Sequence, residues 1–300
     1  MIYDIRHTTR FDYAGPVRFA RCNLRLEPIT WEGQLLDCHS LEVRPGGTTE
    51  AVRATWPLAK VTRIVVSESV RTLEIESIAE VHVDRLVPQI MPDDPTISAV
   101  AAAARRSLDP SATGPGDYLY PSPLIPADPR IAAWCAAELA PDRPVVEAGL
   151  ALARAIQAQF AYDTGATTIA TTPAEAFALR RGVCQDFAQV MIAGLRGAGL
   201  PAAYVSGYIR TYPPPGQPRL VGADATHAWV LIWCGAERGW IGVDPTNGIF
   251  MAGDHIVLAI GRDYGDVAPI DGIFLGADAQ SIHVSVDVSP RIDTRAGLIA

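Results

Sequence analysis

The sequence is poor in lysine and carries an excess of negative charge. Lys60 is the only lysine, and the formal net charge at pH 7 is -8. Nucleic acids and anionic membranes attract clustered basic side chains, so we expect neither to be the main partner. No apolar run is long enough to span a bilayer, and residues 1–6 lack the apolar core of a secretory signal. These absences predict a cytoplasmic protein.

Cysteine is also scarce, and its pattern argues against a disulfide framework. The count is odd, no CxxC pair occurs, and a chain of 300 residues with 49% hydrophobic residues can build its core without disulfides. This usage fits a reducing compartment. The five cysteines are Cys22, Cys38, Cys135, Cys184 and Cys234.

The common signatures of metal and cofactor sites are missing as well. Zinc sites usually contain closely spaced ligand pairs. The residues that could combine in one zinc site include no such pair: Cys184, His227, Cys234 and His255. The sequence also has no GxSxG motif, P-loop or Rossmann fingerprint. We therefore expect neither a metal nor a cofactor.

The N-terminal third has the pattern of an antiparallel β-sandwich or barrel. Short alternating runs are separated by turns, and no helical period appears. A turn is expected at Ala14-Gly15-Pro16. The expected strands are residues 3–13, 17–26, 35–43, 51–57, 61–70 and 73–83. His7, His39 and His82 are scattered over these strands and are predicted to be ordinary core or surface residues.

A proline-rich stretch, residues 88–129, separates this region from the rest of the chain. It contains one Ala-rich helix, expected over 96–108, and is typical of a connector. We therefore divide the chain into an N-terminal β domain (1–90), a connector (91–127) and a second domain, the core, with C-terminal strands (128–300).

The second half predicts helices first and strands afterwards, which is an α+β order. Asp128-Pro129 begins a helix that should run to about residue 139, and Thr172-Pro173-Ala174-Glu175 is a capping box. Further helices are expected over 145–160 and from Cys184 to the glycines near 197. Strands are expected at 202–209, 226–233, 239–244 and 281–288, with a proline-rich loop at 213–216.

Cys184 stands at the predicted start of a helix, directly after Gly182-Val183. Phe187, Val190 and Leu195 follow at helical spacing. A thiol in the first turn lies near unpaired N–H groups and the positive end of the helix dipole. Both favour the thiolate, which is the nucleophilic form.

His227 and Asp244 lie on two apolar strands that are joined closely enough to form a hairpin. If Trp233 pairs with Arg238, then Asp244 lies directly opposite His227; a shift of two residues leaves it diagonal on the same face. Either register lets the carboxylate orient the imidazole, which a cysteine nucleophile needs as its base. Asp224 is a rival orienting group, in a loop.

The motifs around these residues resemble those of the transglutaminase-like superfamily, in its bacterial two-domain class with an N-terminal β domain that includes candidate cysteine proteases. The matching stretches are FAY (160–162), TPAEAF (172–177), GVCQDFA (182–188), GLPAAYVSGY (199–208), HAW (227–229), GWIGVDPT (239–246) and GRDY with DVAP (261–269). His7-Thr8-Thr9 and Phe11-Asp12-Tyr13 match near the N-terminus. Ala203 departs from the pattern, because many relatives carry Arg there.

This resemblance implies a papain-like core, in which a helix bearing the cysteine packs on an antiparallel sheet bearing His and Asp. It implies that Cys184 is the nucleophile, His227 the base and then the acid, and Asp244 the orienting group. Tyr162, Gln185 and Trp229 become candidates for oxyanion or substrate binding. Tyr162 and Gln185 could equally serve packing or helix capping.

We therefore expect a cysteine-dependent acyl-transfer enzyme that acts on an amide or peptide bond of a protein or peptide substrate through a thioester. Hydrolysis is favoured; transglutaminase-type amine transfer and a catalytically silent scaffold are the alternatives. The oligomeric state and the substrate's identity do not follow from the sequence.

Overall fold

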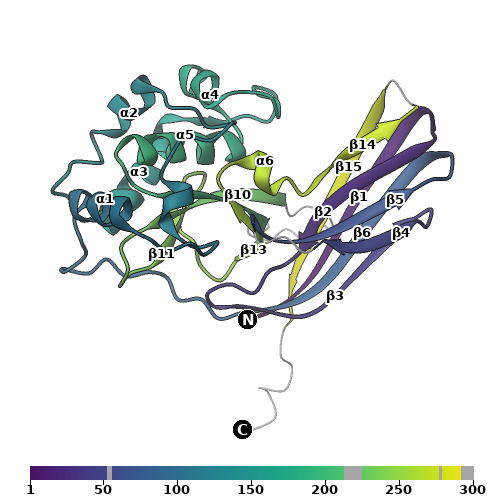
Figure 1. Ribbon diagram of the computed structural model, residues 1–300, viewed down its shortest axis with the longest axis horizontal. Helices are drawn as coiled ribbons and strands as arrows, with labels where there is room; N and C mark the ends of the chain where they lie inside the picture. The colour runs from purple at the N-terminus through teal and green to yellow at the C-terminus, as the bar shows by residue number, and fades with distance from the viewer. Residues whose placement is uncertain (53–55, 213–224, 277–278, 292–300) are drawn as a thin grey trace, which may run out of the picture.

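The computed structural model describes residues 1–300 apart from 53–55, 213–224, 277–278 and 292–300. Helices gather at one end of the molecule, and long strands form the other (Figure 1). The fold is mixed, with antiparallel sheets and more strand than helix, so the α+β prediction is confirmed. The predicted 213–216 loop lies outside the described residues, as does part of the predicted strand 51–57.

The N-terminal strands pair into two facing layers. Phe11 and Ile75 of one layer share a buried apolar cluster with Leu24 and Ile64 of the other. Alternation of buried and exposed residues along these strands produces this sandwich. The strands are β1 (Ile2–Val17), β2 (Phe19–Glu27), β3 (Gln34–Arg44), β4 (Thr48–Val52), β5 (Leu58–Val66) and β6 (Val70–Val83).

The helical half contains one large helix that organises the others. α5 (Cys184–Gly197) packs against α2, α4 and the central strands, and its predicted apolar positions Phe187, Val190 and Leu195 are buried. The remaining helices are α1 (Ile97–Arg106), the 3-10 helix η1 (Pro115–Tyr118), α2 (Pro129–Cys135), α3 (Val145–Gln159), α4 (Pro173–Leu179) and α6 (Tyr264–Val267). The capping box at Thr172 and Glu175 forms as predicted.

The strands of the helical half continue into the sandwich. One sheet has the order β12-β11-β10-β9-β13-β5-β2-β14, with β4 also paired to β5; the other has the order β15-β1-β6-β3. The C-terminal strands β14 and β15 therefore lie in the N-terminal layers. The strands not yet named are β7 (Ala161–Tyr162), β8 (Arg181–Gly182), β9 (Ala202–Ile209), β10 (Ala225–Trp233), β11 (Trp240–Asp244), β12 (Ile249–Phe250), β13 (His255–Gly261), β14 (Ile270–Leu275) and β15 (Gln280–Pro290).

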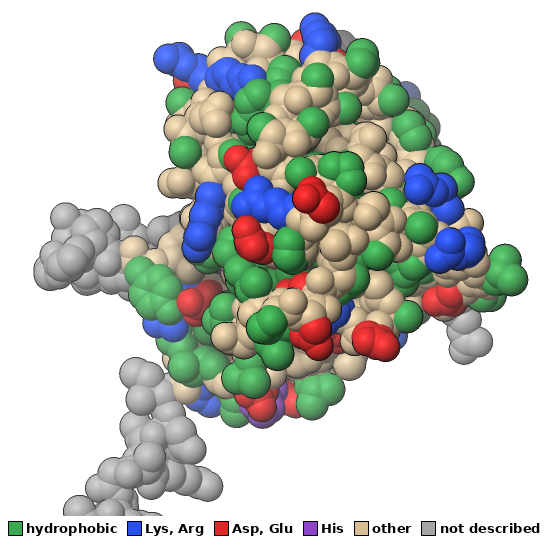
Figure 2. Space-filling model, turned by 90° about the vertical axis from the view of Figure 1, so that its left-hand side faces the viewer, with side chains coloured by type: hydrophobic (Ala, Val, Ile, Leu, Met, Phe, Trp, Pro, Cys, Tyr) green, Lys and Arg blue, Asp and Glu red, His purple; other side chains and the backbone are tan. Residues whose placement is uncertain are grey.

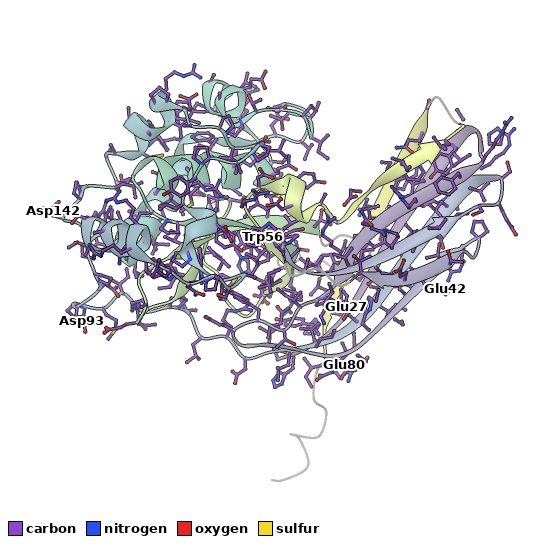
Figure 3. All side chains as sticks on the ribbon, viewed as in Figure 1. Glu27, Glu42, Trp56, Glu80, Asp93 and Asp142 are labelled. Carbon is purple, nitrogen blue, oxygen red and sulfur yellow. The ribbon has the colours of Figure 1, made fainter. Side chains whose placement is uncertain are left out.

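Aromatic rings fill the junction between the helical half and the sandwich. Trp56, labelled in Figure 3, has its ring centroid 5.1 Å from that of Tyr118, which lies 5.0 Å from Trp240. Rings at such separations pack favourably in tilted or edge-on geometry. The proline-rich connector is thereby fixed against the strand that leads to Asp244.

Three local predictions were wrong. The turn expected between strands 61–70 and 73–83 lies at 67–69, because β5 ends at Val66 and β6 begins at Val70. The turn expected at Ala14-Gly15-Pro16 is absent: β1 continues to Val17, and its pairing with β6 shifts register after Asp12. The helix expected to reach residue 139 ends at Cys135, because the N–H groups of Glu138 and Leu139 both turn back to the Cys135 carbonyl oxygen. The division at residues 90 and 127 stays a prediction.

Candidate active site

The segment that presents Cys184 is held by the buried carboxylate of Asp186. Asp186 Oδ2 accepts the Val183 N–H at 2.8 Å and the Thr167 hydroxyl at 2.7 Å. A Cβ on Gly182 would lie 2.4 Å from the same oxygen, so only glycine fits there. The half-buried Cys184 then begins α5, where first-turn N–H groups have no partner within the helix.

His227 and Asp244 come together from neighbouring strands. His227 Nε2 lies 2.8 Å from Asp244 Oδ2, and both side chains are buried. β10 and β11 pair Trp233 with Trp240, which is the second of the two registers considered: Asp244 lies diagonal to His227. The bond to Asp244 occupies Nε2 and leaves Nδ1 of the imidazole for Cys184.

The pKa values of this pair move in opposite directions. Burial alone would lower the pKa of His227, but the hydrogen bond to Asp244 and the nearby Cys184 outweigh it and raise that pKa well above its ordinary value. Burial would raise the pKa of Asp244, yet hydrogen bonds from His227 and His255 bring it far below its ordinary value. The pair is therefore an imidazolium beside a carboxylate near neutral pH.

His255 is the residue of this site that sequence reasoning did not assign. Its Nε2 lies 3.2 Å from Asp244 Oδ2, the oxygen that also binds His227. His255 begins β13, which is separated from β10 by β9 in the sheet order. Only the pairing of β13 with β9 could have indicated the proximity, and that pairing has no signature in a single sequence.

The three lower-ranked predicted residues lie in different environments. Tyr162 is 56% exposed, and it pairs with Gly182 across β7 and β8. Partial burial of the phenol and the nearby Cys184 raise the pKa of Tyr162. Gln185 is half-buried in the first turn of α5. Trp229 is buried and donates its indole N–H to Met251 Sδ at 3.0 Å.

Trp229 supports the histidines from the side. Its ring centroid lies 5.9 Å from that of His227 and 5.1 Å from that of His255. The ring crosses β9 at Gly207, where a Cβ would lie 2.4 Å from the indole. The rival orienting residue, Asp224, lies outside the described residues.

His227, Asp244 and His255 could reach a single metal ion, because one ligand atom of each lies within 4.8 Å of the others. However, Asp244 Oδ2 already accepts both imidazoles and the Asn247 side-chain amide, the latter at 2.6 Å. In addition, His255 Nδ1 accepts the Ala252 N–H, so the His255 proton sits on Nε2, the nitrogen that would have to bind the ion. The donor set therefore fits a hydrogen-bonded cluster better than a metal centre.

Among the residues that the structure describes, no helix is both long and apolar enough to cross a membrane. Figure 2 shows basic and acidic side chains interspersed among apolar ones on the face that it presents. Charges of one sign do not gather on that face.

Comparison with known proteins gives matches in both halves of the chain. Residues 134–245 match the model of the transglutaminase-like superfamily, and residues 3–82 match that of the bacterial transglutaminase-like N-terminal region. An uncharacterized protein of Mycobacterium tuberculosis is 36% identical over 293 residues, which is 96% of this chain and 92% of that protein. An uncharacterized protein of Mycobacterium leprae is 29% identical over 94% of this chain and 96% of its own length.

A solved structure extends the likeness to the whole fold. A candidate cysteine protease from Cytophaga hutchinsonii superimposes with a TM-score of 0.77 at 22% identity, over 98% of this chain and 92% of that one. At this identity the likeness concerns the fold. The two family matches together with the full-length mycobacterial relatives show that the chain belongs to the transglutaminase-like superfamily, in its bacterial class with a transglutaminase-like N-terminal region.

Proposed function

We propose that the protein is a cysteine-dependent acyl-transfer enzyme that cleaves an amide or peptide bond. The observation that carries this proposal is the buried His227–Asp244 hydrogen bond, which holds an imidazolium beside a thiol at a helix N-terminus. A thiolate paired with an imidazolium is the nucleophile of cysteine hydrolases. Membership of the transglutaminase-like superfamily supports the same class of chemistry.

In the proposed reaction, the Cys184 thiolate attacks the carbonyl carbon of the substrate, and a C–S bond forms. The imidazolium of His227 gives its Nδ1 proton to the leaving nitrogen as the C–N bond breaks, which releases ammonia or an amine. Water then attacks the thioester while His227 takes its proton, and the C–S bond breaks. Backbone N–H of Cys184 would stabilise the oxyanion, with Tyr162 as the candidate second donor.

Transfer to an amine is the second candidate function. A protein-glutamine gamma-glutamyltransferase of Pseudomonas aeruginosa is 44% identical over 71 residues, which is 23% of this chain and 10% of that protein. In transfer, an amine replaces water in the step that resolves the thioester. We favour hydrolysis because water needs no second substrate site.

A protein or peptide is the proposed substrate, and we expect neither nucleic acid nor membrane as a partner. We propose that the protein acts in the cytoplasm, where its cysteines, all free, would stay reduced. Substrate profiling tests the first proposal, and cell fractionation tests the second.

The test uses an unstructured peptide library with and without a labelled primary amine, read by mass spectrometry. Cleavage or deamidation that is lost in Cys184→Ala is expected. Efficient incorporation of the amine would replace hydrolysis by transfer. If neither reaction occurs and Cys184→Ala binds peptides of the library as well as the wild type does, a catalytically silent scaffold would be favoured.

A further inference from the structure

The imidazole of His255 is completely buried and has one defined hydrogen-bonding state. Its Nδ1 accepts the backbone N–H of Ala252 at 3.3 Å, so its proton must sit on Nε2. Nε2 points at Asp244 Oδ2, 3.2 Å away. Burial outweighs the opposing influence of the Asp244 carboxylate and lowers the pKa of His255, so the ring is a neutral donor.

Asp244 is held on every side. Oδ1 accepts the backbone N–H groups of Thr246 and Asn247, at 2.8 and 3.2 Å, and Oδ2 accepts His227, His255 and the Asn247 amide. The turn after β11 therefore fixes Oδ1 through backbone N–H groups, whereas Oδ2, which binds His227, is positioned by side chains. His255 is the member of that group that comes from another part of the sheet.

The turn that carries His255 is anchored by the N-terminal strands. Arg85, which follows β6, donates from Nη1 to the carbonyl oxygens of Ala252 and His255, at 3.2 and 2.8 Å. Tyr3 of β1 donates its hydroxyl to Asp254 Oδ1 at 2.8 Å. These contacts join the sandwich to the turn before the imidazole through a few partly buried groups. Arg85, Asp244 and His227 are the charged groups around the ring.

We propose that His255 is a positioning residue, whose Nε2–H holds Asp244 Oδ2 in line with His227 so that Nδ1 of His227 faces Cys184. His255 touches neither the substrate nor the thiol. Because Arg85 and Tyr3 hold the turn before His255, the N-terminal strands help to build the site. The proposal rests on the proposed function, because it concerns the group that orients the catalytic base.

Two conservative substitutions separate the two nitrogens of the ring. His255→Gln carries an amide near the position of Nε2 and can still donate to Asp244, whereas His255→Asn places its amide near Nδ1 and cannot reach the carboxylate. The readout is the second-order rate of Cys184 labelling by iodoacetamide between pH 5 and 9, with thermal unfolding measured beside it. No substrate is required.

Cys184 in His255→Asn should be labelled more slowly near pH 6, by on the order of 10-fold to 100-fold. At pH 9, where an ordinary thiol with a pKa of about 8.5 is mostly ionised, its rate should approach that of the wild type. His255→Gln should recover most of the wild-type rate. A wild-type profile in a folded His255→Asn, or equal slowing in both folded variants, would overturn the proposal. An ordinary thiol profile in the wild type would instead mean that the proposed function has failed.

Discussion

The carboxylate of Asp244 meets His227 across a diagonal of the β10–β11 hairpin, with 2.8 Å between Oδ2 and Nε2. Continuing this register by one residue beyond Val230–Val243 places Trp229 opposite Asp244, and the Trp229 ring packs beside both histidines. The diagonal geometry leaves the carboxylate room for a second imidazole, that of His255. A cross-strand acid and base thereby form the centre of a larger buried cluster.

Asp244→Asn should remove the charge that keeps His227 protonated while preserving the shape of the side chain. We expect Cys184 labelling near pH 6 to fall by roughly 10-fold to 300-fold, because an ordinary thiol has a pKa of about 8.5 and is largely protonated there. The alkaline limit of activity should also move to lower pH. Asp12→Asn, in the sandwich, is the matched control; equal effects of both variants would refute the role of Asp244.

Gly182→Ala should displace the segment that presents Cys184. The added Cβ would lie 2.4 Å from Asp186 Oδ2, which accepts the Val183 N–H. We expect slower Cys184 labelling and a free energy of unfolding lower by about 1–3 kcal/mol, as for other overpacked sites. Gly116→Ala is the control, because a Cβ there meets nothing within 4 Å. Unchanged labelling in a folded Gly182→Ala would argue against this mechanism.

Gln34→Leu should weaken the link between β3 and β13. Gln34 is fully buried, donates to the carbonyl oxygens of Ile29 and Val257 at 2.7 and 2.9 Å, and accepts the Val257 N–H at 2.8 Å. Leucine leaves the Ile29 carbonyl oxygen and the Val257 N–H without the Gln34 side chain, whereas the Val257 carbonyl oxygen keeps the Ile29 N–H at 3.3 Å. The two lost partners should lower the free energy of unfolding by about 3 kcal/mol in urea titrations. The exposed Gln89→Leu should change it little; a comparable loss there would contradict the account.

His7 should make the protein sensitive to mild acid. Burial lowers the pKa of His7 to about 4. Its Nδ1 lies 2.9 Å from the Tyr208 hydroxyl oxygen, and its Nε2 lies 2.8 Å from Thr9 Oγ1. The unfolded chain binds this proton near pH 6.5 and the folded one near pH 4, so stability falls as the pH is lowered through that window.

The loss attributable to His7 is about 3 kcal/mol between pH 7.5 and pH 4. His7→Asn should be less stable at neutral pH but show a smaller decrease on acidification, in denaturant titrations at both pH values. Parallel decreases in the two proteins would show that His7 does not carry the effect.

The main helices, most of the strands, the Cys184 helix and the His227–Asp244 proximity could be predicted from the sequence, because each depends on local periodicity or on a short hairpin. The strands β13 and β14 were not predicted. The position of His255 could not be predicted, since it requires the order β10-β9-β13 and the small Gly207 beneath Trp229. The pairing of β14 with β2 and of β15 with β1 could not be predicted either. The alternating pattern of residues 281–288 predicts a strand but not its partner.

We propose that Cys184 reacts as a thiolate that His227 activates. The most direct test of this proposal is iodoacetamide labelling near pH 6, read by intact mass and peptide mapping, in the wild type and in His227→Ala. We predict rapid, selective labelling of Cys184 in the wild type and loss of that selectivity in His227→Ala. Labelling of Cys184 no faster than that of the exposed Cys38, or equally fast in both proteins, would contradict the account.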